Sequence, residues 1–182
     1  MTKNLLLSRL PALLYTVLLA MVLGCVTDDL EEPIESEDVA TNSEKFTKRS
    51  SNFNFTASLK GDNEVPPKTT NATGNAIVKI SKDETSIYYK ITVGNIEDVR
   101  ASHFHMALPG ENGPVVVTLF TNTDQPAGRT NGILAEGTIT AKDVGGPLSG
   151  DLAAVIEEIR NGGIYVNVHT AEIPSGELRG NL

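Results

Sequence analysis

The sequence has no tryptophan, a single cysteine and few basic residues. One cysteine excludes an intramolecular disulfide, so the fold must depend on its hydrophobic core. With 15 basic against 23 acidic side chains among 182 residues, the net charge of -8 argues against a nucleic-acid partner. The chain also lacks a Gly-x-Ser-x-Gly nucleophile motif and a phosphate-binding loop, so a hydrolase or a phosphate-binding enzyme is not expected, and the residues identify no other reaction.

The N-terminal segment has the pattern of a secretory leader. Lys3 and Arg9 precede an apolar run that is shorter than the roughly 20 residues needed to span a bilayer. Cys25 follows Gly24 directly after this run, and the arrangement resembles the lipobox of microbial lipoproteins, in which the cysteine thiol carries lipid. The sequence therefore predicts a lipoprotein signal peptide over residues 1–24 and lipidation of Cys25. The alternative is an ordinary secreted protein with a free thiol.

Residues 25–51 are expected to form a disordered acidic linker. Its first part has acidic residues and no lysine or arginine, and such a tract repels itself and stays extended. In some lipoproteins, acidic residues soon after the anchor cysteine act as a signal for export to the cell surface, and this segment resembles such a signal. The predicted location is therefore the cell envelope, outside the cytoplasm, with the membrane as a partner through the lipid. The acidic residues are Asp28, Asp29, Glu31, Glu32, Glu35, Glu37 and Asp38.

From residue 53 onward the hydrophobic pattern changes to period two. Phe53, Phe55 and Ala57 fall on one side of an extended segment, which is typical of a half-buried strand. Similar segments follow at short intervals, and most are separated by Gly, Pro, Asn or Asp. Strands are expected at residues 53–59, 74–80, 86–93, 101–107, 115–120, 133–139, 164–170 and 176–182.

One segment departs from this alternation. Residues 152–159 have apolar side chains spaced three and four apart, which predicts a short amphipathic helix capped by Ser149 or Asp151. Because the other segments read as strands without intervening helices, the fold class is all-β. We expect an antiparallel Greek-key or immunoglobulin-like β-sandwich with one short helix, formed by residues 52–182.

All three histidines fall within two of the predicted strands. His103 and His105 are two residues apart and therefore project from the same face, about 7 Å from each other. His169 can join them if its strand pairs nearby, and Tyr165 and Asn167 would share its face. Three converging imidazoles can hold copper or zinc with one coordination position open. A hydrogen-bonded structural role for these histidines is the alternative.

Seven short motifs occur in the order found in CHRD domains, the family named for chordin. The resemblance covers residues 52–182 and is closest in kind to the single-copy form of microbial secreted proteins and lipoproteins. It implies an extracellular β-sandwich of immunoglobulin-like character with no established general enzymatic activity. The cysteine-rich modules that accompany the copies in chordin are missing here. The motifs lie at residues 55–61, 64–67, 73–74, 101–105, 112–116, 163–170 and 174–180.

Three charged residues within these motifs are further candidates for the surroundings of the histidines. Glu64 precedes two prolines that cannot donate to a β-ladder, so it is expected to be an exposed loop acid, or else a carboxylate directed at the histidines. Glu177 and Arg179 are two apart on a predicted strand and share one face. They are expected to pair with each other or with charged groups across that face.

Two functions follow from these residues. The first is a lipid-anchored, extracytoplasmic module for binding, adhesion or structure, with an extracellular protein or glycan as its partner. The second is a small copper or zinc protein that uses His103, His105 and His169. In this respect the chain is similar to the copper side of copper/zinc superoxide dismutases, but it has no histidine for a bridging ligand, no disulfide and no zinc loop. A complete dismutase site therefore cannot form.

Overall fold

The computed structural model of the protein describes residues 52–182. The predicted signal peptide (1–24), the predicted lipidation site Cys25 and the predicted linker (25–51) lie outside the described residues.

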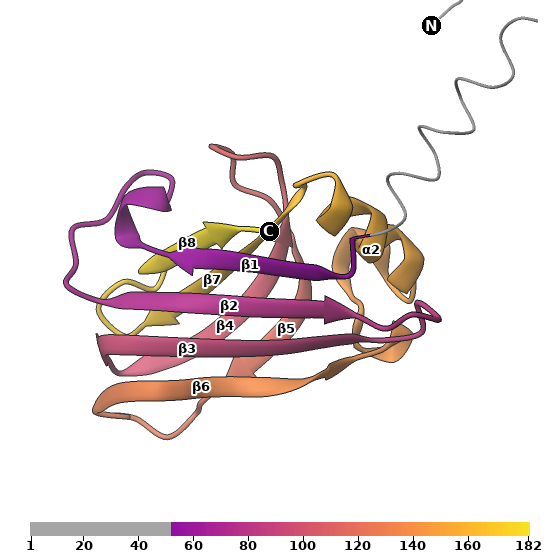
Figure 1. The fold of residues 1–182 in the computed structure, drawn as a ribbon. Coiled ribbons are helices and arrows are strands. Elements are labelled where there is room, and N and C mark those ends of the chain that lie inside the picture. Colours follow the sequence, from indigo (N-terminus) through magenta and orange to yellow (C-terminus); the bar gives the residue numbers. More distant parts are fainter. Residues whose placement is uncertain (1–51) are drawn as a thin grey trace, which may run out of the picture. The chain divides into compact units, whose positions relative to one another are not determined.

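Eight strands form two antiparallel sheets of four strands each, in the orders β1-β2-β3-β6 and β5-β4-β7-β8. Figure 1 shows the sheets as two layers, with the first sheet in front. This arrangement confirms the all-β sandwich expected from the alternating pattern. The strands are β1 (Asn54–Leu59), β2 (Thr73–Ile80), β3 (Ile87–Glu97), β4 (Val99–Met106), β5 (Val115–Thr121), β6 (Arg129–Ile139), β7 (Ile164–Thr170) and β8 (Leu178–Asn181).

The core lies between the two sheets and consists of aliphatic residues with one phenylalanine. Alternate side chains point into it, as in β2, where Ala76, Val78 and Ile80 are buried and alternate with more exposed residues. Complete burial of a side chain of this size contributes about 1.5–3 kcal/mol. The buried side chains of the second sheet that point inward include Phe104, Val116, Val166, Val168 and Leu178.

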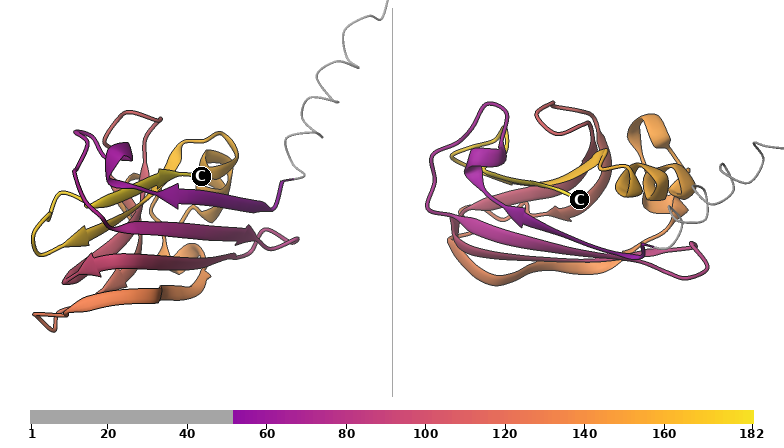
Figure 2. Two further views of the ribbon diagram at one scale, coloured as in Figure 1. Left: turned by 60° about the vertical axis from the view of Figure 1, so that its left-hand side comes forward. Right: turned by 45° about the horizontal axis from the view of Figure 1, so that its top comes forward.

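Helix α2 (Leu152–Arg160) lies at one end of the sandwich (Figures 1 and 2). Of the two residues predicted to cap it, Asp151 does so, since its Oδ1 accepts a hydrogen bond from the Ala154 amide at 2.9 Å. Gly162 follows the helix with a positive φ of 74°. The apolar face of α2 joins the core through Leu152, Val155, Ile156 and Ile159. Within residues 52–182, no helix has the length and hydropathy needed to cross a membrane.

β3 and β6 extend well beyond the residues that the sequence pattern predicts. β3 continues to Glu97, and the chain then enters the second sheet at Asp98, which has a positive φ of 49°. The Asp98 carboxylate accepts a hydrogen bond from the Gly128 amide at 2.7 Å, which fixes this corner next to the start of β6. β6 begins at Arg129 because it pairs with the extension of β3, across two register irregularities. Period-two patterns do not reveal such irregularities.

The β1–β2 connection lies beside β8, because backbone hydrogen bonds join Lys60 and Arg179 in both directions, at 3.0 and 3.1 Å. The connection begins with the 3-10 helix η1 (Gly61–Asn63) and contains Glu64 and the two prolines. As expected, this proline segment lies outside the β-ladders. The other 3-10 helices are η2 (Ala141–Asp143) and η3 (Gly146–Leu148).

Candidate metal centre

β4 and β7 are neighbours in the second sheet, and their pairing brings the histidines together. In the antiparallel register, His103 lies opposite Asn167, His105 opposite Tyr165, and Ala101 opposite His169. From Ala101 onward on β4, and along β7, odd-numbered side chains therefore share the outer face of the sheet, while Phe104, Val166 and Val168 enter the core. The polar residues gathered on this face are His103, His105, Tyr165, Asn167 and His169.

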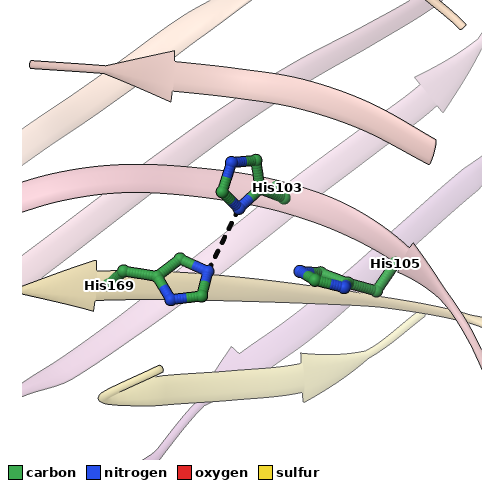
Figure 3. Close-up of side chains that lie close together, drawn as sticks. All are labelled: His103, His105 and His169. Atoms are coloured by element: carbon green, nitrogen blue, oxygen red, sulfur yellow. Dashed lines mark hydrogen bonds between the residues drawn. The ribbon is translucent and has the colours of Figure 1, made fainter. Parts of the chain in front are cut away.

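Figure 3 shows the three imidazoles directed toward one another from β4 and β7. One nitrogen from each ring lies within 4.8 Å of the other two. The closest pair is His103 Nδ1 and His169 Nε2, at 3.1 Å. The ring centroids of His103 and His105 are 5.6 Å apart, somewhat closer than the spacing along an ideal strand. The geometry is thus compact enough for a single small ligand.

Backbone carbonyls orient two of the three rings. His105 Nδ1 lies 2.8 Å from the Gly113 carbonyl oxygen, and His169 Nδ1 lies 2.9 Å from that of Pro174. A carbonyl oxygen only accepts hydrogen bonds, so each Nδ1 carries the proton and each neutral ring keeps its lone pair on Nε2. The Nε2 atom of His105 is buried and has no hydrogen-bond partner in the protein.

Burial keeps the three rings neutral. It is the main reason why the pKa of His103 falls from 6.5 to about 4, and repulsion from His169 and His105 adds to the effect. Burial likewise lowers the pKa values of His105 and His169, against the opposing effect of their carbonyl partners. At neutral pH the three rings are therefore uncharged, and the lone pair of His169 Nε2 accepts a hydrogen bond from His103 Nδ1.

Two loops come together beside this face of the sheet (Figures 1 and 2). The Asn112 side chain in the β4–β5 loop donates a hydrogen bond of 2.7 Å to the Val65 carbonyl in the β1–β2 loop. Gly113 packs so closely against Met106 that an added Cβ would lie 1.8 Å from the Met106 carbonyl oxygen. Only glycine fits there, and its close approach allows its own carbonyl to reach His105.

Arg179, Tyr165 and His105 form a stack across three adjacent strands. The Arg179 guanidinium carbon lies 3.5 Å from the centroid of the Tyr165 ring, and the Tyr165 and His105 rings are 4.8 Å apart and 7° from parallel. Because β7 lies between β8 and β4, Arg179 and His105 approach Tyr165 from opposite sides. Arg179 is completely buried, and its guanidinium donates to the Glu111 carbonyl and the Asn112 side chain.

The expected pairing of Glu177 with Arg179 does not occur. Glu177 precedes β8 and accepts hydrogen bonds from the hydroxyls of Thr70 and Thr170, at 2.6 and 2.7 Å. These two hydroxyls orient the carboxylate, and no hydrogen bond joins it to Arg179 or to the histidines. Sequence parity was misleading here because the strand begins one residue after Glu177.

The expectation that Glu64 is an exposed loop acid is wrong, since it is only 5% exposed. Its carboxylate packs against Gly176, and one oxygen has no hydrogen-bond partner in the protein. Burial raises the pKa of Glu64, while the positive charge of Arg179 acts in the opposite direction. Among the charges that influence Glu64, Arg179 is the strongest, and no hydrogen bond joins Glu64 to the histidines.

Asn167 lies between His103 on β4 and Arg179 on β8 in the register of the sheet. It is 2% exposed, it influences the protonation of both His103 and His105, and its Oδ1 has no hydrogen-bond partner in the protein. Sequence reasoning had placed Tyr165 and Asn167 on the face of His169, and the structure has them there. It did not identify Asn112, Gly113 or Pro174, although their Gly- and Pro-rich loops were recognised as turns.

The fold and the histidine cluster define a compact all-β domain with a polar site on the outer face of one sheet. The family model of the CHRD domain matches residues 55–182, well over half of the chain. The chain therefore belongs to the CHRD domain family, an extracellular type of β-domain module. No curated protein and no solved structure matches the sequence.

Proposed function

We propose that this CHRD domain binds one copper or zinc ion through His103, His105 and His169. One observation carries the proposal: the buried Nε2 of His105 has no hydrogen-bond partner, while its Nδ1 is fixed by a backbone carbonyl. A buried polar atom without a partner costs about 1–3 kcal/mol. A metal ion shared with the neighbouring rings would satisfy that atom.

The distances support a shared ion. Bonds of about 2.0–2.1 Å at tetrahedral angles place two ligand nitrogens roughly 3.4 Å apart. His103 Nδ1 and His169 Nε2, which share a hydrogen bond at 3.1 Å, are already near this separation, and an ion would take the place of the shared proton once His103 adopts its other tautomer. The widest separation in the cluster is within 4.8 Å, so small rotations of the imidazoles suffice to bring in the third ligand.

The orientation of the rings supports the same conclusion. Histidines that bind a metal usually donate their second ring N–H to a carbonyl or carboxylate, which fixes the tautomer. His105 and His169 have this arrangement, with Gly113 and Pro174 as the acceptors. Three neutral imidazoles without thiolate or carboxylate neighbours suit copper and zinc better than magnesium or calcium.

A binding or adhesion role has less support from the described surface. Contact surfaces for macromolecules are usually enriched in aromatic residues or contiguous apolar area. Within residues 52–182, the large hydrophobic residues that are exposed are Leu108, Val115 and Ile133, and none of them is aromatic. We therefore take metal binding as the function that the geometry favours.

The test is a metal titration of the full-length chain in mild detergent, with Cys25→Ser so that the thiol does not bind metal. After treatment with a chelator, zinc and copper are titrated by calorimetry and competition with coloured chelators. We expect one ion per chain. His105→Asn and His169→Asn should each weaken binding by more than about 100-fold, because losing a ligand costs more than losing a partner of a ligand.

Tyr165→Phe is the matched control. It removes only the hydroxyl that accepts a long hydrogen bond of 3.4 Å from the Gly113 amide, while the ring stays stacked on His105 and no nitrogen is lost, so binding should stay within a few-fold of wild type. The proposal fails if the wild-type protein binds no ion stoichiometrically. It also fails if the histidine variants bind as tightly as Tyr165→Phe.

We also propose that lipid on Cys25 anchors the domain to a membrane of the cell envelope. The support is the apolar leader that ends in Gly24 and Cys25 and the acidic segment that follows. Mass spectrometry of the protein from its native envelope should find a lipid-modified N-terminal cysteine. A Cys25→Ser chain should leave the detergent phase in phase partitioning, and its continued retention there would contradict the anchor.

A further inference from the structure

The stack of Arg179, Tyr165 and His105 places a permanent positive charge close to the proposed metal site. Its two separations of 3.5 and 4.8 Å put the guanidinium carbon within about 8 Å of the His105 ring centroid. The guanidinium is fixed in this position, since Arg179 is completely buried and is hydrogen-bonded to the Glu111 carbonyl and the Asn112 side chain. Its electrostatic influence extends to His105.

No carboxylate neutralises this charge at close range. The ion pairs of residues 52–182 join Lys90 to Glu136 and Arg160 to Glu84, and neither involves Arg179 or a histidine. Arg179 is the strongest charge that acts on Glu64, but the two side chains form no ion pair. Glu64 is not among the groups that influence the three imidazoles.

A partly buried site of neutral ligands beside a fixed cation favours the ion of lower charge. Each unit of positive charge on the metal is repelled by Arg179, so the divalent ion is repelled twice as strongly as the monovalent one. Zinc has no stable monovalent state, whereas copper can take up one electron. The charge arrangement thus discriminates between two states of copper.

We propose that the three-histidine site is a one-electron copper centre in which Arg179, stacked through Tyr165, stabilises Cu(I) relative to Cu(II). This inference rests on the proposed function and goes further by naming the metal and its redox role. The step is Cu(II) plus one electron to give Cu(I), and a soluble one-electron donor such as ascorbate supplies the electron. No protein bond forms or breaks, and the imidazoles stay neutral.

The size of the effect follows from Coulomb's law. At about 10 Å and an effective dielectric constant of about 20, one unit charge changes the Cu(I)-to-Cu(II) affinity ratio by about tenfold. For a one-electron couple this factor corresponds to about 59 mV in the midpoint potential. Arg179 acts by its charge and touches no reacting atom, so the potential is the appropriate measurement.

The experiment uses the full-length Cys25→Ser protein in detergent, loaded with copper. Its midpoint potential is measured by redox titration, with the Cu(II) signal followed by electron paramagnetic resonance. Arg179→Gln should lower the midpoint potential by about 59 mV. Arg179→Lys keeps the charge, so it should retain most of the wild-type potential even though it loses the planar stack.

Arg160→Gln is the matched control. Arg160 is also largely buried and lies over an aromatic ring, that of Phe53 at 5.7 Å, but it belongs to α2 and pairs with Glu84. Removing its charge should change the Cu(I)-to-Cu(II) affinity ratio by no more than about twofold, because distance and solvent screen the charge of Arg160 from the copper. A general loss of packing would affect both arginine variants alike.

Several outcomes would overturn the inference. An unchanged potential in copper-loaded Arg179→Gln contradicts the role of Arg179. Stoichiometric binding of zinc without binding of copper leaves the proposed function intact but refutes the copper centre, whereas binding of neither refutes both. If Arg179→Gln does not fold, the wild-type potential must exceed that of copper with free imidazole in the same buffer, and an equal or lower value contradicts the inference.

Discussion

Acidification is expected to destabilise the metal-free domain more than its carboxylates alone would. The three imidazoles are partly or fully buried as neutral rings, and the fold must accept protons on them when the pH falls. The groups that face His103 are His105 on the same strand and His169 and Asn167 on β7. None of them is an acid that would compensate a new positive charge.

The magnitude follows from His103. Its pKa falls from 6.5 to about 4 in the folded state, and at 1.36 kcal/mol per unit this corresponds to about 3 kcal/mol at full protonation. Since the ring is partly exposed, solvent screening reduces the effect to about 2 kcal/mol. A depressed pKa favours the neutral form in the fold, so the stability is complete above pH 6.5 and is lost as the pH falls toward 4.

The assay is urea unfolding of residues 52–182, which contain the complete described core, at pH 7, 6, 5 and 4 with a chelator present. Circular dichroism reports the transition, since the chain lacks tryptophan. Wild type and His103→Gln are compared at each pH, which cancels the contribution of the carboxylates. Between pH 7 and 4, we expect the free energy of unfolding of His103→Gln to fall by about 2 kcal/mol less than that of wild type. Equal losses in the two proteins would refute the reasoning.

Two further substitutions test the surroundings of the site. Glu64→Gln should raise the free energy of unfolding at pH 7, because burial raises the pKa of Glu64 and the fold favours its uncharged form. The stability linked to Glu64 is complete below its ordinary pKa and is lost as the pH rises, so the gain should vanish near pH 4 in urea unfolding. Gly113→Ala should cost more than about 2 kcal/mol, since its Cβ would collide with Met106. Gly113→Ala should also weaken metal binding, because it displaces the carbonyl that accepts from His105. An unchanged metal affinity of this variant in calorimetry would contradict the prediction.

The fold could be predicted from the sequence because the information is local. Alternating apolar residues and turn residues between them define the strands, and the three- and four-residue spacing after Asp151 defines the helix. What remained hidden depends on pairing between distant segments. β6 begins at Arg129 because β3 extends to Glu97, and no periodicity records that partnership.

The candidate site, too, could be predicted only as far as local sequence patterns reach. Parity alone places His103 and His105 on one face, but only the pairing of β4 with β7 adds His169. The environment of Glu64 and Arg179 depends on loops that meet through Asn112, far from both in sequence. Loop acids are usually exposed and charged neighbours on a strand usually pair, and both expectations fail where long-range contacts bury the residue.

The distribution of unpaired polar atoms separates a site from ordinary structure. Within residues 52–182, six buried side-chain atoms have no protein hydrogen-bond partner, and all but the one on Arg160 belong to the outer face of the second sheet or to Glu64. Each costs about 1–3 kcal/mol, and apolar residues on that face would avoid the cost. Proteins accept such local conflicts mainly at functional sites. A structural role for the histidines accounts for the carbonyl contacts of His105 and His169, but it gives no reason to leave the opposite nitrogen of His105 unpaired. A ligand shared by the three imidazoles accounts for both.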